Sequence, residues 1–161
     1  MKKSSHGFSL VELLIVVAII LTIAAIAIPS LLRSRIAANQ SSAVASLHTM
    51  NIAEVTYSST YGAGFSSDLE SLAPPATAGA VASSTAAGLI DSVLASGTKS
   101  GYSFAYSPGA IDTTGRINTY NFSANPISSS TGTEYYYIDE TGVTRLNATT
   151  SAGSTDSPVG N

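Results

Sequence analysis

Residues 8–28 read FSLVELLIVVAIILTIAAIAI, an apolar run of 21 residues with a single ionisable side chain, Glu12. At a rise of about 1.5 Å per residue, a helix of this length covers about 31 Å, close to the roughly 30 Å thickness of the hydrocarbon layer of a bilayer. The run therefore predicts a helix that can span a membrane. A secretory signal peptide has a shorter apolar region, of about 7–15 residues, followed by a small-residue cleavage site, so removal of this segment is disfavoured.

Few charges flank the apolar run. Lys2 and Lys3 precede it and Arg33 and Arg35 follow it, so the positive-inside rule does not orient the helix by itself. In all 161 residues, seven Lys and Arg stand against ten Asp and Glu, which gives a formal charge of −3. This balance of charges does not predict a basic surface that could bind a nucleic acid. The absence of Cys excludes a disulfide framework, a thiolate zinc site and a cysteine nucleophile.

Glu12 is the most informative residue of the run. A carboxylate at the centre of a membrane helix costs about 2.5–3.5 kcal/mol on insertion scales and is a functional residue by default. Two interpretations follow from the residues alone. Either Glu12 requires a partner charge, or it lies in the first turn of a helix that begins near Phe8, where it complements the helix dipole and reaches toward the lipid headgroups.

The residues around the start of the run form a specific combination. A short basic leader, MKKSSHG, ends at Gly7; Phe8 follows, Glu12 comes four residues later, and Pro29 stands just beyond the apolar run. This combination resembles the type III signal sequence of type IV prepilins and of their relatives, the pseudopilins of type II secretion. The resemblance is specific over about residues 1–35 and concerns only the architecture beyond them. In that family a prepilin peptidase cleaves on the cytoplasmic side of the membrane, which places the cut between Gly7 and Phe8, and then methylates the new amine of Phe8.

The resemblance implies a subunit that polymerises. Residues 1–7 are the cytoplasmic leader, and their removal leaves five basic and ten acidic side chains. The trimmed chain is expected in the lipid of the inner membrane until an assembly platform, of a pilus or of type II secretion, joins it to copies of itself. The family pairs the residue matching Glu12 with the terminal amine of a neighbouring subunit, and a buried charge pair of this kind can set axial register.

Beyond the apolar run the helical pattern continues. Pro29 lacks a backbone donor and its ring clashes with the preceding turn, which predicts a kink or a local opening. Apolar and aromatic side chains then recur at helical spacing, at Ile36, Ala43, Leu47, Met50, Tyr57 and Tyr61. Residues 29–61 are therefore predicted to form an amphipathic half of the long helix that ends at Gly62. Arg33 and Arg35 either pair with acids of adjacent subunits or form a solvated collar.

The remaining residues predict a small head. Residues 62–101 are rich in Ala, Ser, Thr and Gly and predict a connecting loop with short helices, one of them over 84–96. Residues 102–146 alternate with a period of two between turn signals, which predicts an antiparallel sheet of about four strands. Residues 147–161 predict a flexible polar tail. The expected fold is α+β and type IV pilin-like, with a long amino-terminal helix packed on this sheet.

Side chains that could carry chemistry are scarce. His48 is the only His outside the leader and has no metal-binding residue at ligand spacing, so a surface histidine is expected. No Ser stands in a nucleophile motif with a base, so no catalytic residue is assigned and no enzyme is expected. Asp112 and Asp139 begin turns that could bind calcium, but neither has the full loop signature. Ordinary turn chemistry is expected there, with no metal and no cofactor.

Three functions share this evidence. The favoured one is a structural subunit of a type IV pilus-like filament, held in the inner membrane before assembly and extracellular afterwards. The first alternative is a pseudopilin of the type II secretion system, which ends in a short periplasmic filament; the head lacks the acid-rich calcium loop expected there. The second is a membrane-anchored periplasmic protein that never polymerises. Glycosylation, motility, adhesion and DNA uptake stay open.

Overall fold

A computed structural model describes residues 8–77 and 79–160. The predicted leader, with Gly7 of the cleavage position, lies outside the described residues. The chain divides into two compact units, one ending at Arg35 and one covering Ile36–Asn161. Its elements are α1 (Leu10–Tyr61), the 3-10 turn η1 (Glu70–Leu72), α2 (Ser92–Ala95), β1 (Thr98–Lys99), β2 (Tyr102–Pro108), β3 (Tyr120–Pro126), β4 (Tyr135–Asp139), β5 (Arg145–Asn147) and β6 (Ser157–Pro158).

The strands form one antiparallel meander in the order β1-β2-β3-β4-β5-β6. Its longest pairing joins β2 to β3, with Phe104 opposite Ala124. The predicted α+β class, a long helix on an antiparallel sheet, is confirmed. The predicted number of about four strands is wrong, because β1 and β6 add to the sheet. Each of these has two residues, too few to display the period of two by which a strand is recognised in a sequence.

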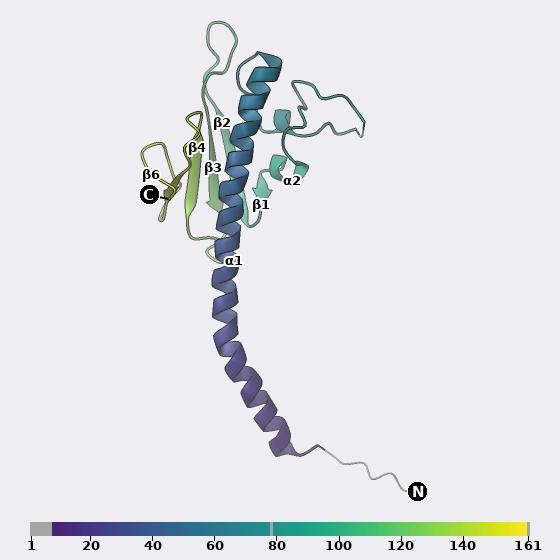
Figure 1. Cartoon of the computed structure of the whole chain (residues 1–161), viewed down its shortest axis with the longest axis vertical. Helices are drawn as coiled ribbons and strands as arrows, with labels where there is room; N and C mark the ends of the chain where they lie inside the picture. Colours follow the sequence, from purple (N-terminus) through teal and green to yellow (C-terminus); the bar gives the residue numbers. More distant parts are fainter. Residues whose placement is uncertain (1–7, 78, 161) are drawn as a thin grey trace. The chain divides into compact units, whose positions relative to one another are not determined.

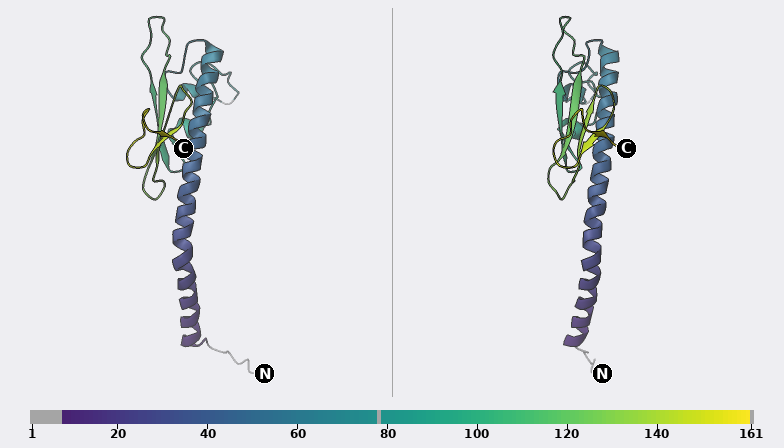
Figure 2. Two further views of the ribbon diagram at one scale, coloured as in Figure 1. Left: turned by 60° about the vertical axis from the view of Figure 1, so that its left-hand side comes forward. Right: turned by 90° about the vertical axis from the view of Figure 1, so that its left-hand side faces the viewer.

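The core of the head lies between the sheet and residues 36–61 of α1 (Figure 1). The two rotated views show the sheet and this part of α1 as two layers (Figure 2). Side chains alternate along β2 and β3, so that every second one faces the helix. The buried apolar side chains of the strands are Tyr102, Phe104, Tyr120, Phe122, Ala124, Tyr136 and Ile138. On α1 they meet the buried Ala43, Leu47, Met50, Ala53 and Tyr57.

Helix α1 ends where the sequence predicts. Gly62 has a φ of +66°, a left-handed conformation that glycine adopts without strain. Its backbone N–H donates to the carbonyl of Ser58 at 3.0 Å, which closes the last turn. The amphipathic half predicted over 29–61 is helical throughout, since α1 runs to Tyr61.

The loop after α1 contains less helix than its composition suggests. A helix is predicted over 84–96, whereas α2 covers only Ser92–Ala95. Gly88 has a φ of +67°, which a helix cannot accommodate, so the helix starts after it. The carboxylate of Asp91 then accepts a hydrogen bond from the N–H of Leu94 at 2.8 Å and caps the start of α2.

In place of the flexible tail predicted for residues 147–161, the described residues up to 160 fold back onto the sheet. Strand β6 pairs with β5, and Ala152 is buried. Asp156 organises this return: its carboxylate accepts from Asn147 Nδ2 at 3.1 Å and from the N–H of Gly153 at 2.8 Å, and its carbonyl accepts from Arg145 Nη1 at 2.9 Å. Hydrogen bonds thus order a segment that contains few apolar residues.

Candidate functional site

The candidate site begins at the first residues of α1. Phe8 and Ser9 precede the helix, and the N–H of Leu13 donates to the carbonyl of Ser9 at 3.2 Å. Glu12 lies in the first turn, where its carboxylate complements the free backbone N–H groups. Within the part of the chain that the structure describes, the one ion pair joins Lys99 to Asp91 and does not involve Glu12. The geometry therefore agrees with a first-turn position and shows no ion-pair partner for Glu12 among the described residues.

The helix that follows is apolar on all sides. Every large apolar side chain from Phe8 to Leu32 is exposed, with no exposed fraction below 44%. Soluble helices carry an apolar stripe on one side, whereas a helix that is apolar all round is stable only inside a membrane or among other apolar helices. Among the described residues, α1 is the one helix long and apolar enough to cross a membrane. Its first half has no covering surface within the described chain.

Pro29 lies inside α1, and the helix continues on both sides of it. Because proline has no N–H, the carbonyl of Ala25 loses its usual intrahelical donor. The kink or opening predicted at Pro29 stays a prediction. Arg33 and Arg35 are exposed just beyond it.

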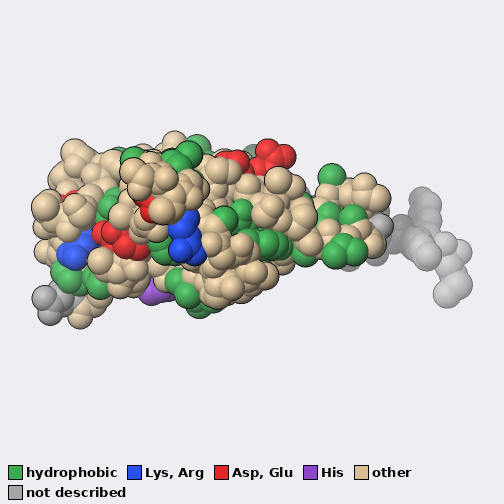
Figure 3. Space-filling model, turned by 90° about the horizontal axis from the view of Figure 1, so that it is seen from above, with side chains coloured by type: hydrophobic (Ala, Val, Ile, Leu, Met, Phe, Trp, Pro, Cys, Tyr) green, Lys and Arg blue, Asp and Glu red, His purple; other side chains and the backbone are tan. Residues whose placement is uncertain are grey.

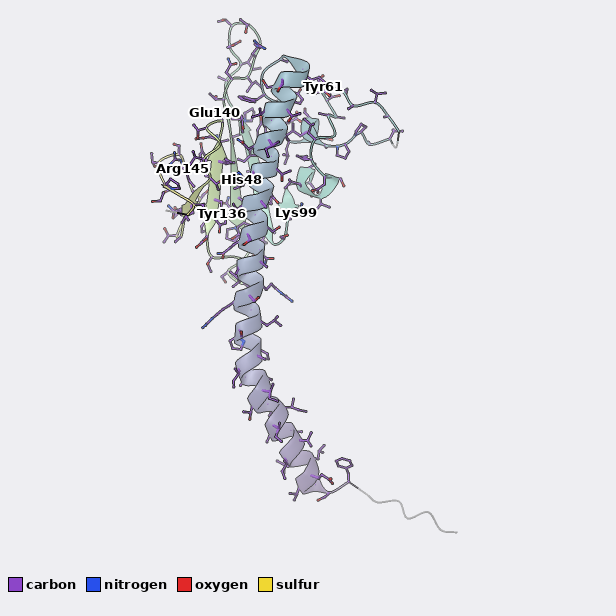
Figure 4. The ribbon with its side chains drawn as sticks, viewed as in Figure 1. His48, Tyr61, Lys99, Tyr136, Glu140 and Arg145 are labelled. Atoms are coloured by element: carbon purple, nitrogen blue, oxygen red, sulfur yellow. The ribbon has the colours of Figure 1, made fainter. Side chains whose placement is uncertain are left out.

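The surface of the head is poor in charge. Figure 3 shows its acidic and basic side chains in small separate groups on the face that it presents. Figure 4 places Glu140 and Arg145 on the strand side of the head and Lys99 near α2. His48 is exposed on α1, with its Nε2 atom 3.3 Å from Thr144 Oγ1. This agrees with the expected surface histidine.

The two acidic turns hold their own backbone together. Asp112 Oδ1 accepts from the N–H and the hydroxyl of Thr114 at 2.7 and 2.6 Å and from the N–H of Arg116 at 3.0 Å. The hydrogen bond from the Thr114 hydroxyl has the largest influence, and together these hydrogen bonds lower the pKa of Asp112. Asp139 Oδ1 accepts from the Thr141 hydroxyl at 2.5 Å in the same way. In the described ranges, no three His, Cys, Asp or Glu residues gather as a metal site would require.

Sequence reasoning missed one buried carboxylate, Glu54 of α1. Its side chain is fully buried and accepts a hydrogen bond at Oε2 from the N–H of Ser66 at 2.9 Å. Burial raises the pKa of Glu54 above its ordinary value of 4.5. A signal was present: Glu54 stands four residues after Met50 and three before Tyr57, on the apolar face of the predicted helix.

Comparison with known families agrees with the amino-terminal pattern. Residues 2–28 match the family model of the prokaryotic N-terminal methylation motif, which is the signal motif of type IV prepilins. The resemblance derived from the leader and the apolar run is thereby confirmed. The family is a structural one and not an enzyme family, and the motif together with the apolar helix fits anchoring in a membrane. No curated protein and no solved structure matches the chain.

Proposed function

We propose that this chain, a carrier of the prepilin methylation motif, is a structural subunit of a type IV pilus-like filament. One observation carries the proposal. The motif contains the first part of a helix, and the large apolar side chains from Phe8 to Leu32 are exposed on every side. Such a helix needs lipid around it before assembly and the same helices of other copies afterwards. A membrane supplies the first environment and a filament the second.

The maturation site is the Gly7–Phe8 bond. A prepilin peptidase cuts there, on the cytoplasmic side, and methylates the new amine of Phe8. That amine has a reference pKa of about 7.7–8.0, so it is largely protonated at neutral pH, and methylation keeps the positive charge. Support comes from the match of the motif to residues 2–28 and from the position of Phe8 at the exposed end of α1.

Glu12 sets the register between subunits. Burial of apolar side chains stabilises the filament by about 25 cal/mol per Å² but is indifferent to a sliding displacement of one helix along another. A buried carboxylate is tolerated only at the stagger that brings it to a positive group, here the methylated amine of Phe8 on a neighbouring copy. Pro29 introduces the bend that lets the apolar half pack among its copies while the heads stay outside.

The route to the filament starts in the inner membrane. The chain spans it once, with residues 1–7 in the cytoplasm and the head outside. An assembly platform then takes the trimmed subunit from the lipid into the growing filament. Exposure of the filament at the cell surface distinguishes this function from a periplasmic pseudopilus.

The first experiment is to shear cells and to collect the filaments by high-speed centrifugation. The intact mass and the amino-terminal sequence of this chain are then measured in the pellet. We expect a chain that begins at N-methyl-Phe8 within the sheared filaments. A trimmed chain confined to the membrane would favour the pseudopilin, and a chain that still begins at Met1 would refute the proposal.

A second experiment isolates the role of Glu12. In Glu12→Gln the side chain keeps its size and loses its charge, so cleavage and methylation should proceed while the yield of sheared filaments falls at least about tenfold, as expected for the loss of a buried charge pair. Glu70→Gln is the matched control, because Glu70 is an exposed acid of the head. A normal filament yield in Glu12→Gln would show that Glu12 has no role in assembly.

A further inference from the structure

Glu54 occupies a closed site between α1, the first residues of the following loop, and the strands β2 and β3. Neither Glu54 nor Ser66 exposes any surface. Both oxygens of the Glu54 carboxyl face Ser66: Oε2 accepts from the Ser66 N–H at 2.9 Å, and Oε1 lies 2.5 Å from the Ser66 hydroxyl. These two contacts link α1 directly to the start of the loop that begins at Gly62.

The number of protons available at this site constrains the protonation state of Glu54. The Ser66 hydroxyl lies 2.5 Å from Glu54 Oε1 and 3.0 Å from the carbonyl oxygen of Asp68, and it has one proton to donate. A carbonyl oxygen can only accept. If Glu54 were ionised, the Ser66 proton would serve one of two acceptors, and the other would lose its partner. A neutral Glu54 donates to Ser66 Oγ, and the Ser66 hydroxyl then donates to Asp68, so both contacts are made.

Among the described residues, no compensating cation faces Glu54. Within the described residues the one ion pair, Lys99 to Asp91, lies elsewhere. The titratable groups that face Glu54 are Tyr57 on α1, Asp68 on the loop, Tyr106 on β2 and Tyr120 on β3. None of them carries a positive charge.

The same surroundings shift the titration of Glu54. Burial is the largest influence and raises the pKa of Glu54, while the hydrogen bonds from Ser66 lower it by less. Tyr106 also closes the site from the sheet side, because its hydroxyl donates to the carbonyl of Ser66 at 2.7 Å. Burial raises the pKa of Tyr106 as well, so this hydroxyl keeps its proton and its donor role.

We propose that Glu54 is protonated in the folded head and that its carboxyl O–H, donated to Ser66 Oγ, is a pH-sensitive latch between α1 and the loop that begins at Gly62. When Glu54 ionises, the Ser66 hydroxyl turns to donate to the carboxylate, so its hydrogen bond to the Asp68 carbonyl within the loop is lost. The contact between α1 and the loop then buries a negative charge that no cation compensates, which destabilises it. This inference does not depend on the role of the chain in a filament.

The sign of the pH dependence follows from linkage. Because the pKa of Glu54 is raised in the folded state, folding takes up a proton, and the stabilisation is complete below the ordinary value of 4.5. As the pH rises above 4.5, this contribution is lost until the folded pKa is reached. In that interval the unfolding equilibrium constant increases by up to about tenfold for each pH unit.

Infrared spectroscopy of the full chain in detergent micelles tests the protonation state. The difference spectrum between the wild type and Glu54→Gln should keep the carbonyl band of a protonated carboxylic acid as the pH is raised above 4.5. Glu70→Gln, which removes an exposed carboxyl of the same loop, is the matched control and is measured at the same pH values. If the acid band of the Glu54→Gln difference disappeared at the same pH as that of the Glu70→Gln difference, the proposal would be overturned.

A second variant and a second readout cover a failure of Glu54→Gln to fold. Ser66→Ala removes the hydroxyl that accepts from Glu54, so the acid carbonyl band should shift in frequency while Glu54 stays buried. The thermal midpoint of the wild type should fall as the pH is raised from about 5 to about 8, and that of Glu54→Gln should fall less. Equal pH dependence in the wild type and in Glu54→Gln, or an unshifted band in Ser66→Ala, would overturn the latch.

Discussion

Gly64 is the position at which a single methyl group should damage the head most selectively. It follows α1 by three residues, has a φ of +85°, and forms an isolated parallel bridge with Ile117. A Cβ atom at Gly64 would lie 2.3 Å from the carbonyl oxygen of Ile117 and 2.8 Å from its nitrogen. Both are backbone atoms, so no side-chain rotation can relieve the contact.

The cost of Gly64→Ala has two parts. The left-handed conformation costs a non-glycine residue about 1–2 kcal/mol. The clash also separates the two segments and breaks the hydrogen bond that the Phe65 N–H donates to the Ile117 carbonyl at 2.8 Å. Loss of a buried partner adds about 1–3 kcal/mol, so the total should be about 2–5 kcal/mol. Gly62→Ala is the matched control: its φ is +66° and nothing lies within 4 Å of its Cβ, so it should cost only the conformational part.

Urea titration followed by near-ultraviolet circular dichroism measures the difference. All eight tyrosines lie between Tyr57 and Tyr137, and the chain has no Trp, so the signal reports on the head even when the full chain is held in micelles. We expect Gly64→Ala to lose at least about 1 kcal/mol more than Gly62→Ala. Equal losses would mean that the loop moves away from Ile117 without cost, and the reasoning from the bridge would be refuted.

Three further changes test other parts of the head. Phe122→Ala removes a fully buried ring and should cost about 3–5 kcal/mol in the same titration, whereas the exposed Ile52→Ala should stay within about 0.5 kcal/mol; similar losses would contradict the assigned core. Asn51→Ala leaves two acceptors of the sheet, at 2.6 and 3.2 Å from its amide, without their donor, and should lower the unfolding free energy by about 1–3 kcal/mol; an unchanged midpoint would count against that link. Asp91→Ala removes the cap of α2. The pKa of Asp91 is lowered in the folded head, mainly by the hydrogen bond from Lys99, so the stabilisation by its carboxylate should be present above pH 3.8 and disappear as the pH falls below that value. A stability difference between Asp91→Ala and the wild type that persists in acid would refute this assignment.

The sequence predicts most reliably the features that depend on contiguous residues. The apolar run at 8–28, the helix end at Gly62 and the alternation in β2 to β4 are local patterns, and the structure has each of them. The strand number was underestimated because β1 and β6 exist only through pairing with a neighbouring strand. The return of residues 147–160 depends on Asp156, whose partners Arg145 and Asn147 belong to β5.

The features of the candidate site also divide into those that depend on contiguous residues and those that depend on the fold. The sequence by itself determined that the chain has a methylation motif and an apolar helix with one carboxylate, because these are properties of one continuous segment whose large apolar side chains are exposed in the described structure. Only the tertiary structure decided that Glu54 is buried against Ser66 and that Gly64 touches Ile117. Those contacts join residues that are brought together by the packing of the sheet on α1, and side-chain burial changes the proton affinity of a carboxyl in a way that no local pattern encodes.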